Sequence, residues 1–117
     1  MFLVTDSVLD STKKILGFEP DYEAFDLDII THINMAFSTL HQLGVGPTVP
    51  FIISDSSDNW SSFIGENKAI ESVKSYVWAK VRLIFDPPAT SFGIAALEKV
   101  CSELEWRLNV QSEEVTI

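Results

Sequence analysis

A double proline between two amphipathic stretches constrains the fold of this chain more than any other feature of its sequence. Pro87 and Pro88 have no backbone N–H, and the ring of Pro87 disfavours helical geometry at Asp86, so a helix that arrives here has to end. Thr90 or Ser91 is suited to cap the helix that follows. Because the connection is so short, the sequence predicts an antiparallel pair of helices with Asp86, Pro87 and Pro88 as their corner.

The length and composition favour one small folded domain. The chain has 117 residues, of which 46% are hydrophobic and 21% are charged. This is enough apolar material for a modest core, and disordered chains contain less. We therefore expect a single helical domain over residues 1–117, and we expect part of the apolar surplus to face partner subunits.

The charge balance argues against a nucleic-acid-binding surface. Eight Lys and Arg stand against 17 Asp and Glu, a net charge of −9, and no segment clusters cations as a phosphate-tracking surface does. An acidic protein is nevertheless suited to line a channel through which DNA passes without adhering. The first residues carry no cationic leader, and Lys80 and Arg82 interrupt the most apolar later run, so neither secretion nor membrane insertion is expected.

Apolar periodicity predicts an all-α fold, a small bundle of about four helices with a long irregular loop between the second and the third. Ser7 or a neighbour caps the first helix and Gly17 closes it, while Gly44 ends a long central helix that begins near Phe25. The four predicted helices span residues 7–16, 25–43, 66–85 and 91–110.

The segment 44–59 is the least helical part of the chain. Glycines and prolines break it, Phe51 to Ile53 form a short apolar run, and a serine-rich polar loop follows before a short helical turn at Trp60. Loops of this length are usually mobile or used for contacts. We expect the apolar run to pack either against the subunit's own core or against a neighbouring subunit.

The predicted helix 66–85 is apolar on two sides. One stripe runs along Ile70, Val73, Val77, Val81 and Ile84, and a second surface comprises Tyr76, Trp78, Leu83 and Phe85. A helix with two apolar sides is buried on both. The pattern is consistent with a central helix in one domain and with a helix that meets the core on one side and a neighbouring subunit on the other.

The last predicted helix has the cleanest apolar stripe, formed by Leu97, Val100, Cys101, Leu104 and Leu108. The stripe predicts that Cys101 is a small buried side chain, and a single cysteine excludes an internal disulfide. Trp106 lies off this stripe, as interface aromatics often do. The short acidic tail, residues 111–117, is expected to be a partner contact.

No catalytic or metal-binding motif is present. His32 and His41 are nine residues apart, so they point to opposite sides of a helix and cannot bind one ion together. Asp26 and Asp28 fall in the first turn of a helix, where the dipole favours carboxylates. The sequence predicts neither an enzyme nor a cofactor, and its features are typical of an assembly component.

Three word-like segments carry a resemblance to a known family. They are LGVGP at residues 43–47, KVRLIFDPP at residues 80–88 and ELEWRLNV at residues 103–110. Through them the chain resembles, from about residue 6 to residue 110, the head-to-tail connector proteins of tailed bacteriophages, also called adaptor or head-completion proteins.

The resemblance implies an all-helical virion subunit, assembled in the host cytoplasm, that forms a ring at the head-tail interface. Such rings are commonly dodecameric, lie beneath the portal protein, extend the DNA channel and dock a tail-side stopper or tail protein. The alternative is a small helical regulatory or adaptor module that works as a dimer on a protein partner. No membrane, cofactor or sequence-specific DNA contact is implied.

Within this framework the residues are assigned to three kinds of contact. The expected subunit interface comprises Phe51, Ile52, Ile53, Tyr76, Trp78 and Phe85. The expected portal contact comprises Trp106, Arg107, Val115 and Ile117. Glu19, Asp21, Glu23 and Asp26 are the candidate acids of the channel lumen, with an ordinary solvated face as the alternative interpretation.

Overall fold

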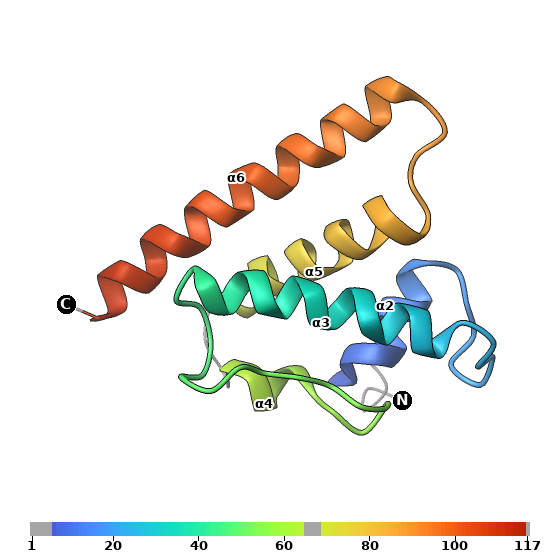
Figure 1. Ribbon diagram of the computed structural model, residues 1–117, viewed down its shortest axis with the longest axis horizontal. Helices are drawn as coiled ribbons and strands as arrows, with labels where there is room; N and C mark the ends of the chain where they lie inside the picture. Colours follow the sequence, from blue (N-terminus) through green and yellow to red (C-terminus); the bar gives the residue numbers. More distant parts are fainter. Residues whose placement is uncertain (1–5, 65–68, 117) are drawn as a thin grey trace.

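The computed structural model describes residues 6–64 and 69–116, with the backbone alone for residues 112–116, and in this part of the chain the fold is all-α (Figure 1). The all-α expectation is therefore confirmed. The helices are α2 (Val8–Ile15), α3 (Asp26–Gln42), α4 (Trp60–Ile64), α5 (Ile70–Phe85) and α6 (Ser91–Thr116). The predicted start of the third long helix at Glu66 lies outside the described residues.

Helix ends follow local chemistry. Ser7 caps α2 by accepting a hydrogen bond from the Asp10 N–H at 3.2 Å, and Gly17 takes a positive φ of 94° just past its end. The α5 helix ends at Phe85 with Asp86 as its C-cap, and the Thr90 hydroxyl accepts from the Gly93 N–H at 3.0 Å at the start of α6. The double proline and the cap therefore act as the sequence predicts.

The α5 helix is the central element of the fold. It packs against α3 on one side and against α6 on the other, and α6 turns back along it after the proline corner (Figure 1). Of the two arrangements left open for this helix, the structure has the central one. Its second apolar side is covered by several elements of the same chain: Tyr76 contacts α6, Trp78 contacts α4, and Phe85 contacts the connection between α2 and α3.

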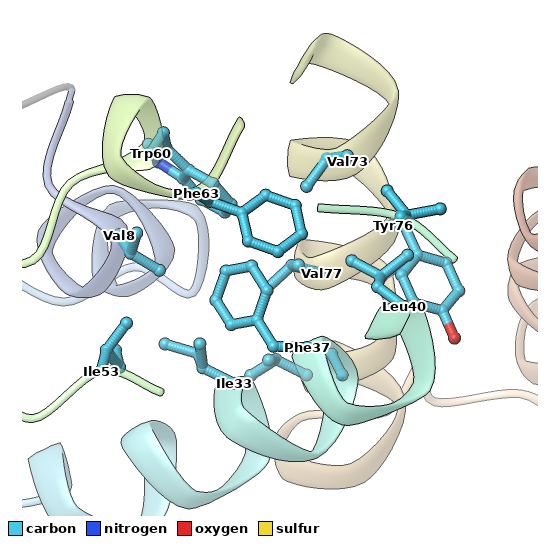
Figure 2. Packing of buried hydrophobic residues seen from close by; sticks show 14 of the residues in the cluster. Val8, Ile33, Phe37, Leu40, Ile53, Trp60, Phe63, Val73, Tyr76 and Val77 are labelled. Carbon is cyan, nitrogen blue, oxygen red and sulfur yellow. The ribbon is translucent and has the colours of Figure 1, made fainter. Parts of the chain in front are cut away.

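The core lies among α2, α3, α4, α5 and the loop before α4. Phe37 is fully buried at its centre, near Trp60 and Phe63 (Figure 2). Its ring centroid lies 5.0 Å from that of Phe51, 6.0 Å from that of Trp60 and 4.8 Å from that of Phe63. Gly46 has a φ of 96°, and a Cβ there would lie 2.5 Å from the Phe63 ring. This glycine therefore allows the loop to approach the aromatic core closely.

The loop of residues 44–59 is packed against its own subunit. The Asn34 side chain accepts from the Ile53 N–H at 2.9 Å and donates to the Ile53 carbonyl at 3.1 Å, which fixes the loop along α3. Farther along, the Val8 N–H donates to the Asp58 carbonyl at 3.0 Å, and the Ser7 hydroxyl donates to the Ser56 carbonyl at 2.8 Å. These bonds tie the end of the loop to the start of α2.

Candidate interaction surfaces

The chemistry of the described residues directs attention to surfaces. Among the side chains of residues 6–64 and 69–111, no three His, Cys, Asp or Glu gather closely enough to hold a metal ion. In the same ranges, no helix combines the length and apolarity that a membrane crossing requires. The question of function therefore becomes which exposed side chains are available to protein partners.

The structure places the predicted interface residues of α5 in different environments. Tyr76 is fully buried against α6, where its hydroxyl donates to Glu105 at 2.7 Å. Trp78 is half-buried and meets Trp60 edge-on at 6.1 Å between centroids. Tyr76 therefore cannot contact a second subunit in this conformation. Trp78 can, because part of its side chain is exposed.

The three predicted interface residues of the loop point in different directions. Ile53 is buried in the core and Phe51 is half-buried against Phe37. Ile52, between them, is 66% exposed. Ile52 is therefore the member of this run that is free for contact, because alternate residues of an extended segment point to opposite sides.

The connection between α2 and α3, together with the first residues of α3, forms an acidic corner, which we define as residues 17–28. Glu19, Asp21 and Glu23 are exposed there, and the segment contains no Lys or Arg. Asp26 differs from them because Lys13, only 1% exposed, places its ammonium 2.8 Å from Asp26 Oδ1 and also donates to the Pro20 carbonyl at 2.7 Å. Three of the four predicted lumen acids are thus uncompensated, and the fourth is paired inside the fold.

Aromatic rings hold this corner against the end of α5. Phe85 meets Phe25 at 5.5 Å and Phe18 at 6.0 Å between ring centroids, and Tyr22 stacks on Phe18 at 5.5 Å. Phe85 was predicted for the subunit interface and the acids for the channel lumen. The structure brings these two predicted sites together at one end of the molecule.

The predicted portal residues lie on α6. Trp106 is 68% exposed, and Arg107 forms an exposed i, i+4 ion pair with Glu103 at 2.7 Å. The backbone of Val115 continues α6, which replaces the expected separate tail over residues 111–116, while Ile117 lies outside the described residues. The portal assignment itself stays a prediction.

Sequence reasoning missed several exposed apolar side chains. Phe92 at the start of α6 is the most exposed of them at 84%, and Leu27 and Val49 are also largely exposed. Phe92 could have been found from its spacing, because it lies on the side of α6 opposite the stripe that contains Cys101. Leu27 gave a similar signal, because it lies between Asp26 and Asp28 on the side of α3 opposite Ile29.

Burial at the contact of α5 with α6 changes the acid–base properties of two groups. Desolvation, with the nearby Glu105 carboxylate, raises the pKa of the Tyr76 hydroxyl far above its usual range. Desolvation also raises the pKa of the Cys101 thiol, although the Lys80 ammonium acts in the opposite direction. Both groups therefore stay protonated at neutral pH.

The Cys101 thiol should report whether α6 is docked on α5. In the native protein we expect an aromatic disulfide reagent to modify it about a hundredfold more slowly than in urea, because the thiol is 4% exposed and its pKa is raised. The chain has one cysteine, so the absorbance of the released thiolate measures this site alone. Equal rates in buffer and in urea would show that α6 does not pack as described.

Comparison with known proteins places these surfaces in context. The model of a family described as phage connector protein matches residues 8–115, which is nearly the whole chain. Comparisons with curated proteins and with solved structures give no significant match. The match covers every helix from α2 to α5 and all but the last residue of α6.

Proposed function

We propose that this chain, which belongs to the phage connector protein family, is a ring-forming structural subunit at the head-tail interface of a virion. In this role it docks beneath the portal, extends the DNA channel and presents a surface to a tail-side stopper or tail protein. The observation that carries the proposal is the family match over residues 8–115. Family membership itself implies a structural connector that associates with other head or tail proteins.

Contacts between subunits are proposed for the predicted interface residues that keep exposed surface. These are Ile52 in the loop and, in part, Phe51, Trp78 and Phe85. Tyr76 and Ile53 act indirectly in this proposal, since they are buried and hold α6 and the loop in place. A heterologous ring requires two different surfaces on each subunit, and Ile52 and Phe85 lie on different elements.

Portal contact is proposed for the exposed part of α6 around Trp106 and Arg107, for Val115 near the end of α6, and for Ile117, which lies outside the described residues. A tryptophan that is 68% exposed on a folded helix is typical of an interface anchor. Arg107 lies beside it in an exposed ion pair with Glu103, so a charged group adjoins the proposed anchor.

The acidic corner is proposed to face the channel. Glu19, Asp21 and Glu23 carry charges that no cation of the described residues neutralises, and carboxylates repel the phosphates of passing DNA. Asp26 contributes less to this repulsion because Lys13 compensates its charge. The role of the subunit is binding throughout, without catalysis or cofactor.

Mixing the purified protein with the portal of its own phage tests the proposal. Electron microscopy should show an added ring on the portal, and Trp106→Ala should abolish or strongly reduce its occupancy, because the substitution removes the proposed anchor. Met35→Ala, at an exposed position of α3 without an assigned role, is the matched control and should leave ring occupancy unchanged. A wild-type protein that leaves the portal bare would contradict the proposed function.

A further inference from the structure

The outward side of α6 carries a regular row of side chains. Its members are spaced alternately by four and three residues, which places them on one line because each helical residue advances about 100°. The row lies opposite Cys101 and Leu108, which are buried toward the body of the subunit. The row comprises Phe92, Ala96, Lys99, Glu103, Trp106 and Val110.

This row is open to solvent in the isolated subunit. All of its members except the half-buried Val110 are exposed, and α6 is the outermost helix (Figure 1). Within the described residues the main neighbour of α6 is α5, which covers its other side. The spacing of the row is that of a coiled-coil seam, so a second helix is the shape that fits it.

The order of the residues makes the row complementary to itself when it is reversed. If two copies of α6 lie antiparallel and cross at the level of residue 101, Lys99 of each copy faces Glu103 of the other. Ala96 then faces Trp106, a small residue against a large one, and Phe92 faces Val110. A parallel pair would place Lys99 against Lys99 and Trp106 against Trp106, so charge and size both select the antiparallel arrangement.

The charges are available for such a pair. Lys99 has no ion-pair partner among the described side chains. Glu103 bonds Arg107 through Oε2 at 2.7 Å, and both side chains are more than half exposed. A carboxylate has room for a second cation, so Glu103 is able to meet Lys99 of a second copy while it keeps Arg107.

We propose that two copies of this protein form a two-fold dimer through the outer row of α6 when no portal is present. The inference goes beyond the proposed ring and does not depend on it, because an isologous pair uses one surface twice while a ring joins two different surfaces. Both the dimer and the proposed portal contact use Trp106. The dimer therefore withholds this anchor until portal binding displaces the second copy.

Charge exchange on the row tests the proposal without any portal. In sedimentation equilibrium the wild type should approach twice the 13.1 kDa subunit mass as its concentration rises. Lys99→Glu and Glu103→Lys should each weaken dimerisation by roughly tenfold or more, because each turns two attractive pairs into two repulsive ones. The double variant K99E/E103K should recover the dimer, since the reversed charges again face each other.

Two controls separate this contact from loss of fold and from a general charge effect. Far-UV circular dichroism and the protection of Cys101 should be unchanged in all three variants, because the altered side chains point away from the body. Lys14→Glu, at an exposed position of α2, changes the net charge as Lys99→Glu does and should leave the dimer intact. A wild type that stays at 13.1 kDa at its highest soluble concentration, or a double variant as monomeric as the single ones, would overturn the proposal.

Discussion

Replacing Phe37 by alanine should lower the free energy of unfolding by about 3–5 kcal/mol, the usual cost of removing a buried phenylalanine. The ring is fully buried and contacts three other aromatic rings, Phe51 of the loop and Trp60 and Phe63 of α4. Truncation leaves a cavity that these rings cannot close without moving the loop off α3. Urea denaturation followed by circular dichroism measures the change. The expected loss is a large part of the total free energy of unfolding, which is about 5–15 kcal/mol for a typical domain.

Phe92→Ala is the matched control for this substitution. It removes the same side chain from a helix, but Phe92 is 84% exposed. The free energy of unfolding should therefore change by less than about 0.5 kcal/mol. This control is run at low protein concentration, where the proposed α6 dimer is dissociated. A cost for Phe37→Ala as small as that of Phe92→Ala would mean that the aromatic core is not packed as described.

The features that the sequence predicted correctly depend on neighbours within a few residues. A proline pair ends a helix whatever lies around it, and the same holds for the cap at Thr90 and for Gly17. The buried position of Cys101 was also predicted, because the stripe of α6 repeats over several turns.

What covers an apolar face is a question of three-dimensional contacts, and periodicity does not answer it. The two-sided pattern of α5 is satisfied by α3, α6, α4 and the connection between α2 and α3, all in the same chain. A neighbouring subunit would have produced the same pattern. The loop shows the same limit. Asn34 reaches across from α3 to bind the backbone of Ile53, and a pairing 19 residues apart in sequence has no local signature.

Lys13 is the residue whose position the sequence least suggested. A lysine near the end of a short helix ordinarily extends into solvent, yet this one is buried. The structural reason is that Asp26, the first residue of α3, and the Pro20 carbonyl of the preceding connection converge on its ammonium. This contact holds the acidic corner in place and so links the core to the proposed lumen surface.

The proposed contacts of α6 impose an order on assembly. Trp106 is assigned both to the portal contact and to the dimer row, so one copy cannot serve both at once. A dimer would keep the most exposed aromatic residues of α6 covered while the protein is free, and exposed apolar surface of this kind otherwise favours aggregation. Portal binding then competes with dimerisation. Ring formation should therefore rise less steeply with subunit concentration above the dimer dissociation constant, because the free monomer then grows only as the square root of the total.

Lys13→Met should lower the free energy of unfolding by about 3 kcal/mol, because removal of one partner leaves the other half-buried and uncompensated. Methionine fills a similar volume, so the loss reports the charge and its hydrogen bond more than the packing. Urea denaturation at neutral pH measures it. The double variant K13M/D26L replaces the pair with apolar side chains and should recover most of the loss, whereas a double variant as unstable as K13M would show that the charge pair is not the cause.

The pH dependence of Lys13→Met provides a second test of the same contact. Burial raises the pKa of the nearby Asp10 carboxyl, and the Lys13 charge opposes this rise. A carboxyl whose pKa is raised in the folded state favours folding when it is protonated, and this contribution is lost as pH rises through the folded pKa. Without Lys13 the pKa of Asp10 should rise further, so the deficit of the variant relative to wild type should shrink as the pH is lowered toward 4. A deficit that stays constant from neutral to acidic pH would mean that Lys13 acts through packing alone, and the acidic corner would then be held by its aromatic rings.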